Sequence, residues 1–291
     1  MMERSDKEIT RRAVLLGGGA AAAAPSSRWQ IGCYTRLWDQ FDYRIGLDGI
    51  AEAGYKYAGL MSHKGRTRIL NTLETTLEEA AAAAEEVRRR GLQTVSVYGG
   101  DFSAHQSVEA GVAGLRRLID NCAAFGSPRL LLGGTGNRDL VQQYYNVVRE
   151  CCDYAVSKGV SLSVKPHGGT NATGAECRRI AGMVGRRNFG IWYDPGNIFF
   201  YSQGAVDPVD DVSSVDGLVV GMSVKDFRPP KDVLVTPGTG KVNFREVLAR
   251  LQRGGFTGGP LVVECVDRRE TPAEIAAEAR KARLMLEDLT A

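Results

Sequence analysis

Short apolar runs alternate with longer amphipathic segments along the chain from residue 29 onward. The short runs are typical of strands, and in residues 161–164 serines alternate with leucine and valine. The longer segments between them are typical of helices. The pattern predicts eight strands, at residues 30–34, 57–61, 94–98, 130–132, 161–165, 190–193, 219–224 and 261–266.

The segments between the strands carry helix start and stop signals. Residues 76–91 begin with acidic residues and end with arginines and a glycine, which suits the helix dipole and the C-cap. Two further segments end in Gly126 and Gly159 in the same way. The last helix is predicted to begin with Thr271 as its N-cap and Pro272 in the first helical position.

Eight strand–helix units in roughly 260 residues predict an α/β fold, a single-domain (β/α)₈ TIM barrel over residues 28–291. The alternative is an open doubly wound sheet. The strand count favours the barrel, and no G-x-G-x-x-G motif follows the first strand. A glycine-rich segment at 133–139 follows the fourth strand and is interpreted as a loop that can hold a hydroxyl or a phosphate.

Residues 1–27 have the layout of a signal peptide. Arg11 and Arg12 precede a weakly apolar run over residues 13–24 and a break at Pro25. We expect a twin-arginine signal and an exported, periplasmic protein; the alternative is a disordered Ala/Gly tail. The apolar run is too short for a stable membrane anchor.

Charge and cysteine content narrow the partners. The net charge is +3, and basic blocks with interleaved aromatic residues are lacking, so we expect no nucleic acid as a partner. The six cysteines fall in predicted helices and strands, without a C-x-x-C pair, which predicts buried free thiols. The oligomeric state stays open, a homo-oligomer included.

Polar and charged residues cluster where the predicted strands end. In a TIM barrel the carboxyl ends of the strands build the active site. Asp194 and Glu264 directly continue apolar runs, which places carboxylates at the mouth of a packed core and makes them site candidates. The candidates after the second, third, fifth, sixth, seventh and eighth strands are His63, His105, Lys165, His167, Asp194, Asn197, Ser223, Lys225, Asp226 and Glu264.

Each candidate also has a plain structural interpretation. Any one histidine is more often a structural residue than a functional one. Asp194 lies in a "DPG" sequence that suits an ordinary turn, and Glu264 fits a buried acid with a structural partner. Lys225 and Asp226 fit a solvated ion pair.

The chain resembles the xylose isomerase-like TIM barrel superfamily, the sugar phosphate isomerase/epimerase group. The resemblance rests on "VSKGVSLSVKPHGG", "NFGIWYDPGNI", "GMSVKDF", "TPGTGKVNFREVLARL" and "GFTGGPLVVE". It implies isomerisation or epimerisation of ketoses and related sugars. It also implies a divalent metal such as Mn²⁺, Co²⁺ or Mg²⁺, held by a Glu, an Asp, a His and a Glu at the ends of strands five to eight.

The sequence departs from that ligand pattern at two of the four positions. Asp194 and Glu264 match, but Lys165 stands in place of the first Glu and Ser223 in place of the His. Asn197 stands where a further histidine is usual. Two carboxylates and one lysine sum to the same charge, −1, as three carboxylates and a dication. We therefore hypothesise that the Lys165 ammonium takes the place of the metal between Asp194 and Glu264.

A shifted metal site is the alternative. His167, His63 or His105 would then join Asp194 and Glu264, and imidazole with carboxylate suits Mn, Fe or Zn. The sequence thus leaves open whether a divalent metal (Mn, Co, Mg or Zn) is bound.

The expected reaction is proton abstraction next to a sugar carbonyl, through an enediolate. Glu264 is expected to be the base and Asp194 its partner or the acid on the opposite face. Lys165, Lys225 or a metal would stabilise the oxyanion, and His167 would hold a substrate hydroxyl. The expected further substrate contacts are His63, His105, Asn197 and Lys225, with Trp38, Phe199 and Tyr201 as residues that stack on a sugar ring.

Two rival functions remain. The same enolate chemistry fits a lyase or hydratase that acts on a keto-glycoside. The non-enzymatic alternative is a carbohydrate-binding barrel that has lost catalysis. The identity of the sugar and its phosphorylation are not encoded in these motifs.

Overall fold

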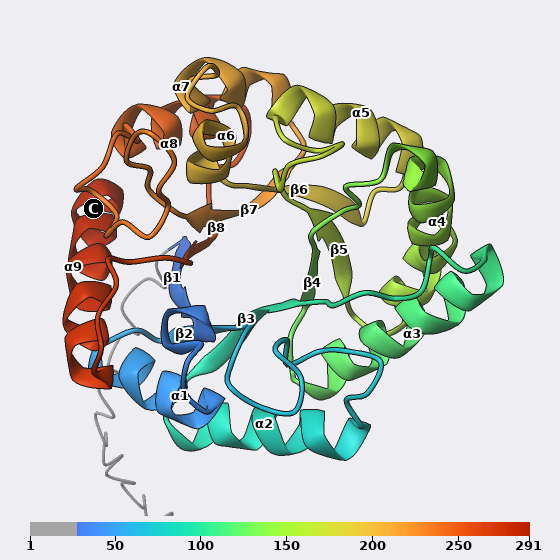
Figure 1. Ribbon diagram of the computed structural model, residues 1–291, viewed down its shortest axis with the longest axis horizontal. Helices are drawn as coiled ribbons and strands as arrows, with labels where there is room; N and C mark the ends of the chain where they lie inside the picture. The colour runs from blue at the N-terminus through green and yellow to red at the C-terminus, as the bar shows by residue number, and fades with distance from the viewer. Residues whose placement is uncertain (1–27) are drawn as a thin grey trace, which may run out of the picture.

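The computed structural model describes residues 28–291, which form one closed barrel of parallel strands (Figure 1). Each strand pairs with the next in sequence, and the first closes on the last from Trp29–Gly259 to Cys33–Val263. The strands are β1 (Trp29–Tyr34), β2 (Tyr57–Leu60), β3 (Gln93–Tyr98), β4 (Arg129–Leu132), β5 (Ser161–Val164), β6 (Phe189–Tyr193), β7 (Val219–Val224) and β8 (Gly259–Val263). The predicted TIM barrel is confirmed.

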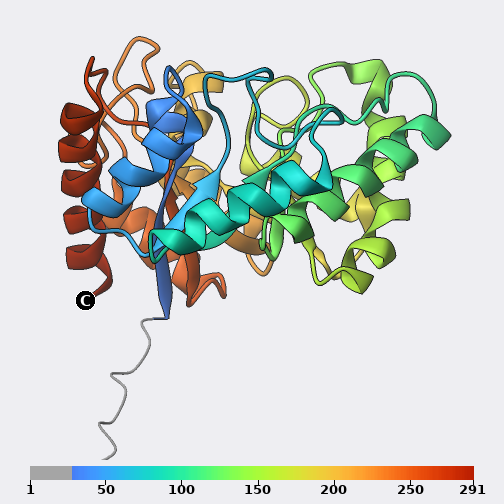
Figure 2. The same cartoon turned by 90° about the horizontal axis from the view of Figure 1, so that it is seen from below.

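Helices surround the barrel, and Figure 2 shows them packed along its outer wall. Short 3₁₀ helices join them at three places. The α-helices are α1 (Tyr43–Glu52), α2 (Leu77–Arg89), α3 (Val108–Ala124), α4 (Val141–Ser157), α5 (Gly174–Val184), α6 (Pro195–Tyr201), α7 (Pro208–Asp211), α8 (Phe244–Arg253) and α9 (Pro272–Thr290). The 3₁₀ helices are η1 (Thr35–Trp38), η2 (Arg138–Leu140) and η3 (Val212–Val215).

Local signals set the helix starts. Thr271 caps α9, with Glu274 completing a capping box and Pro272 in the first turn, as predicted. Thr76 and Thr173 cap α2 and α5 with the same reciprocal pattern.

Three strands, β2, β5 and β8, end slightly earlier than the sequence pattern predicts, and the other five end at the predicted residue. The last pairs in the ladder are Val164–Ile191 and Val224–Val263, so Lys165 and Glu264 are the first residues beyond β5 and β8. Their side chains therefore belong to the mouth of the barrel.

The interior of the barrel is filled by apolar side chains. Tyr34, Met61, Val95, Leu131, Trp192 and Val262 form one buried cluster. A larger cluster lies between the strands and the helices. Because the interior is packed, any binding site must lie above it, at the carboxyl ends of the strands.

All six cysteines are buried and free, as predicted. Cys265 lies just after β8 rather than within the strand. Within residues 28–291 no helix is long and apolar enough to cross a membrane. The predicted signal peptide, with Arg11 and Arg12, lies outside the described residues.

Candidate active site

Four charged side chains from four strand ends meet at the mouth of the barrel. Lys165 follows β5, Asp194 follows β6, Lys225 lies just after β7 and Glu264 follows β8. Each is at most 2 % exposed. We call these four residues the quartet. Their burial requires that each charge find a partner within the group.

Lys165 lies between the two carboxylates, as the hypothesis from its position requires. Its Nζ donates to Glu264 Oε1 and Oε2 at 2.7 and 2.6 Å, and to Asp194 Oδ2 at 3.3 Å. The Nζ atom also lies 6.0 Å from the centre of the Tyr98 ring, within the range of a cation–π interaction.

Lys225, a candidate from the sequence, is a second cation that contacts both carboxylates, an arrangement that the sequence analysis did not predict. Its Nζ donates to Glu264 Oε1 at 2.7 Å, to Asn197 Oδ1 at 3.0 Å and to Asp194 Oδ2 at 3.2 Å. The expected balance of two carboxylates against one lysine is therefore wrong, because two ammonium groups neutralise the two carboxylates. Neither Lys225 nor Asp226 is solvated.

Neutral groups hold the two carboxylates in place. Ser223 Oγ donates to Glu264 Oε2 at 2.6 Å and accepts from Trp192 Nε1 at 3.1 Å. Asp194 is the N-cap of α6, and its Oδ1 accepts from the Asn197 amide at 3.0 Å. Asn197 Nδ2 donates to the Pro166 carbonyl at 2.7 Å. Asn197 is thus a supporting residue, and the expected substrate contact is corrected because both ends of its amide are used.

The ionisation of the quartet follows from this geometry. Burial alone would raise the pKa of Glu264, but Lys165, Lys225 and Arg36 hold it well below its ordinary value. Burial and the repulsion of Lys225 lower the pKa of Lys165, whereas Asp194 and Glu264 outweigh burial and raise the pKa of Lys225. Because the two ammonium groups share the same carboxylates, their titrations are coupled.

The side chains at the four ligand positions do not fit the divalent metal that the resemblance implies. The oxygens of Asp194 and Glu264 accept from ammonium, hydroxyl and backbone groups, and Ser223 offers a hydroxyl where an imidazole would bind. No group of three His, Cys, Asp or Glu in residues 28–291 has the arrangement of a metal site. The shifted site built with a histidine therefore has no counterpart in this region.

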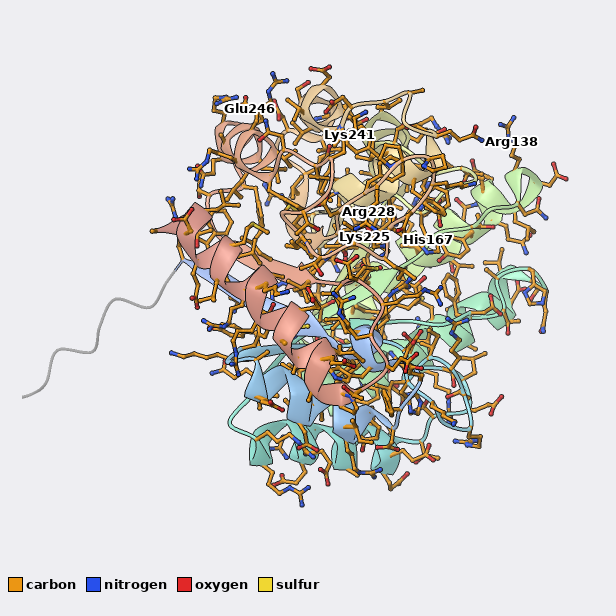
Figure 3. The ribbon with its side chains drawn as sticks, turned by 60° about the vertical axis from the view of Figure 1, so that its left-hand side comes forward. Arg138, His167, Lys225, Arg228, Lys241 and Glu246 are labelled. Atoms are coloured by element: carbon orange, nitrogen blue, oxygen red, sulfur yellow. The ribbon has the colours of Figure 1, made fainter. Side chains whose placement is uncertain are left out.

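His167 lies above the quartet, among aromatic rings. Its ring centre is 5.8 Å from that of Tyr201 and 6.5 Å from that of Tyr98, and Figure 3 shows it close to Lys225. Although part of the His167 side chain is exposed, desolvation of its ring and the cations Lys165 and Lys225 lower its pKa to about 3. The imidazole is therefore neutral at physiological pH and can donate to or accept from a hydroxyl.

The other two histidines do not join this group. His63 packs its ring edge-on against Tyr43, 5.9 Å between centres. His105 is exposed and lies 3.7 Å from Asp101 in the loop before α3. His63 and His105, expected as substrate contacts, thus have partners in the loops around them and not in the quartet.

Two aromatic residues expected to stack on a sugar belong to the core. Trp38 is fully buried and donates from Nε1 to the Pro272 carbonyl at 3.2 Å. It packs against Gly49, where an added Cβ would come within 2.4 Å of the indole. Phe199 is buried and stacks on Phe227 at 5.3 Å. Tyr201 is half-buried beside His167 and remains a candidate for stacking on a sugar ring.

A cavity of about 840 Å³ opens beside the quartet, between the loops that follow β1, β2, β7 and β8. Its volume is in the range of small-molecule sites. Glu264 is the member of the quartet that lines it, together with Arg36. Arg36 Nη1 lies 3.9 Å from Glu264 Oε1, and the side chain is 32 % exposed.

Two residues of this site escaped the sequence reasoning. Arg36 follows the first strand by two residues, as a charged group at the end of an apolar run, the signal that marked Lys165. Tyr98 is the last residue of β3. A Cβ on Gly133 would lie 2.3 Å from its hydroxyl, so the glycine at this position makes room for the Tyr98 side chain.

Comparison with known proteins agrees with the fold. The family model of the xylose isomerase-like TIM barrel matches residues 47–288. A search of curated proteins found no match to this chain.

Solved structures with the same architecture include a xylose isomerase domain protein from Planctomyces limnophilus, with a TM-score of 0.67 and 20% identity over 90% of this chain and 97% of that one. A D-allulose 3-epimerase from Methylomonas sp. has a TM-score of 0.70 and 17% identity over 90% and 98% of the two chains. An L-ribulose 3-epimerase has a TM-score of 0.70 and 14% identity over 90% and 94%. At these identities the structures establish the fold, and with the match of the family model the chain belongs to the xylose isomerase-like TIM barrel family.

Proposed function

We propose that this protein is a metal-independent isomerase or epimerase of a sugar or sugar derivative, acting by proton abstraction next to a carbonyl. The observation that carries the proposal is the buried quartet, in which two ammonium groups contact both carboxylates. Several structures with the same architecture are named sugar 3-epimerases, which supports the substrate class.

The reaction needs a base and a group that stabilises the oxygen of an enediolate. Glu264 is the proposed base, because it lines the cavity. Lys165 and Lys225 are the proposed oxyanion stabilisers, since their ammonium groups lie within hydrogen-bond distance of that base. Asp194, in contact with both lysines, keeps them protonated and in place.

Base strength is the apparent difficulty, because the cations that lower the pKa of Glu264 also weaken it as a base. A substrate carbonyl that accepts a hydrogen bond from one ammonium group draws that cation away from Glu264. The carboxylate then becomes more basic as the carbonyl becomes more polarised, so both changes favour proton abstraction.

The rings above the quartet suit a carbohydrate. Tyr98 and Tyr201 offer apolar faces, and neutral His167 offers a ring nitrogen to a hydroxyl. These three residues replace Trp38 and Phe199 as the proposed sugar contacts.

The test follows hydrogen exchange by NMR in D₂O with D-allulose, D-fructose and L-ribulose, with and without a chelator. Exchange of the proton next to the carbonyl is expected to persist in the chelator. Glu264→Gln should slow it at least about a hundredfold, the usual effect of losing a general base. Lys165→Met should also slow it, whereas Lys241→Met, an exposed lysine against Phe199, is the matched control.

Other outcomes would reject the proposal in distinct ways. Exchange that requires added Mn²⁺ or Co²⁺ would show a metal enzyme. Sugar binding without exchange would favour a binding barrel, to which the complete burial of the quartet is also suited. A keto-glycoside that loses its leaving group would identify a lyase.

A further inference from the structure

The mouth of the barrel carries one cation more than its two carboxylates can balance. Lys165 and Lys225 already match Asp194 and Glu264, and Arg36 adds a third positive charge 3.9 Å from Glu264. That separation is too long for a hydrogen bond. Its guanidinium also contacts the thiol of Cys265, a weak acceptor, and is attracted by Asp39, a carboxylate that is itself paired with Arg68.

The remaining charges around the cavity do not neutralise Arg36. Four of its acidic or basic lining residues are in three other ion pairs: Asp39 with Arg68 at 3.4 Å, Asp267 with Arg228 at 3.0 Å and Arg269 with Glu278 at 2.7 Å. Arg268 and Glu270 lie on the exposed rim and have opposite charges.

Asp226, next to Lys225 in sequence, is also unavailable. Its carboxylate accepts from the backbone amides of Phe227, Gly238, Gly240 and Val242. The unmatched charge at the mouth is therefore that of Arg36, and its side chain is the part of this cation cluster that reaches the cavity.

We infer that the substrate is a sugar acid whose carboxylate binds Arg36. A guanidinium presents donors in a fork that matches a carboxylate in a bidentate pair. Arg36 lies within 3.9 Å of the proposed base, so the anion it binds must be close to the reacting carbon. A carboxylate beside the carbonyl or hydroxyl meets that requirement, whereas a phosphate at the far end of a sugar chain does not. A single negative charge also balances the single unmatched cation.

The inference rests on the proposed function only for the location of the reacting carbon, and its test measures binding rather than turnover. D-Gluconate and D-glucitol, which differ in a carboxylate against a hydroxymethyl group, are titrated into the full chain by calorimetry. Gluconate is expected to bind at least about tenfold more tightly, the value of a charge-assisted hydrogen bond. D-Glucitol 6-phosphate distinguishes a terminal phosphate from the carboxylate.

Variants identify the residue responsible. Arg36→Gln should remove the preference for gluconate and leave the affinity for glucitol unchanged. Arg68→Gln removes an equal charge from the same cavity, but one already paired with Asp39, and should keep the preference. If thermal melting shows Arg36→Gln to be unfolded, Arg36→Lys replaces it as the test. This variant keeps the positive charge but loses the bidentate geometry of the guanidinium, so its preference for gluconate over glucitol should be intermediate.

Several results would overturn the inference. For the wild-type protein, these are equal affinities for gluconate and glucitol, or no binding of gluconate. For the variants, they are a preference for gluconate that persists in Arg36→Gln, or an unchanged preference in Arg36→Lys where Arg36→Gln is unfolded. Tighter binding of glucitol 6-phosphate than of gluconate would assign the cation to a phosphate instead. Arg36-dependent gluconate binding in a protein that exchanges no proton would leave this inference standing and remove only the proposed reaction.

Discussion

At the scale of single residues, the quartet controls the charge of its neighbours. His167 does not belong to the quartet, yet two buried ammonium groups lie below it and disfavour a third cation. Burial acts in the same direction. The imidazole is thus kept as a neutral hydrogen-bonding group through the pH range in which a free histidine titrates.

The lowered pKa of His167 predicts an effect on stability. Its folded pKa, about 3, is below the ordinary value near 6.5, so the unfolded chain binds the proton first as the pH falls. Stability should therefore decrease from about pH 6.5 toward pH 3, and His167→Gln should reduce that slope. Urea unfolding between pH 4 and 7 measures the effect, with His105→Gln, which removes an exposed histidine, as the control. An imidazole NMR signal of His167 that titrates near pH 6.5 would contradict the prediction.

At the scale of elements, the connection between β7 and α8 forms one wall of the cavity through Leu234. Asp226 organises that connection from beneath by accepting four backbone hydrogen bonds. Gly240 lies so close that an added Cβ would be 2.4 Å from the Asp226 carboxylate. Thr236 then ties the loop to Asp267 after β8.

Asp226→Asn should loosen this wall. The amide would point donors at backbone N–H groups, and charge-assisted hydrogen bonds would be lost, so we expect a stability loss of about 2–3 kcal/mol. Limited proteolysis should then cut within residues 228–241. Asp232→Asn changes a carboxylate that accepts from Leu234 in the same loop but is exposed, and it should have a small effect. Equal resistance of the two variants to the protease would refute the role of Asp226.

The elements also show what the sequence can predict and why. Strand order and helix caps follow from local patterns, as at Thr271 and Pro272. Lys225 could not be placed from its neighbours, because its partners Asp194 and Glu264 come from two other strands. Trp38 follows a strand, as the residues of the barrel mouth do, but its indole packs into the core against Gly49 of α1, which has no side chain to block it. Contacts between distant elements decided both cases.

At the scale of the whole molecule, the barrel begins at residue 29, directly after the proposed signal segment. Arg11→Lys with Arg12→Lys should retain the protein in the cytoplasm, because the twin-arginine route depends on the arginine pair. Fractionation of cells that express the two forms measures this, and Lys7→Arg, which keeps the pair, is the control. Undiminished export of the double variant would reject the proposal of a twin-arginine signal.

The charge arrangement of the barrel mouth also predicts how a metal site could be rebuilt in this chain. Lys165→Glu with Ser223→His supplies the family's four ligand types, but Lys225 still donates to both Asp194 and Glu264. We therefore expect the double variant to bind Mn²⁺ weakly and the triple variant with Lys225→Met to bind it at least about tenfold more tightly, because a competing ammonium group has been removed.

Calorimetric titration with Mn²⁺ measures both affinities. The wild-type protein, whose carboxylates face two ammonium groups, should show no stoichiometric uptake of Mn²⁺. Tight binding by the wild-type protein, or equal affinities in the double and triple variants, would show that the lysines do not exclude the metal. An Mn²⁺ affinity that increases from the wild-type protein to the double variant and again to the triple variant would show that both buried ammonium groups exclude the metal.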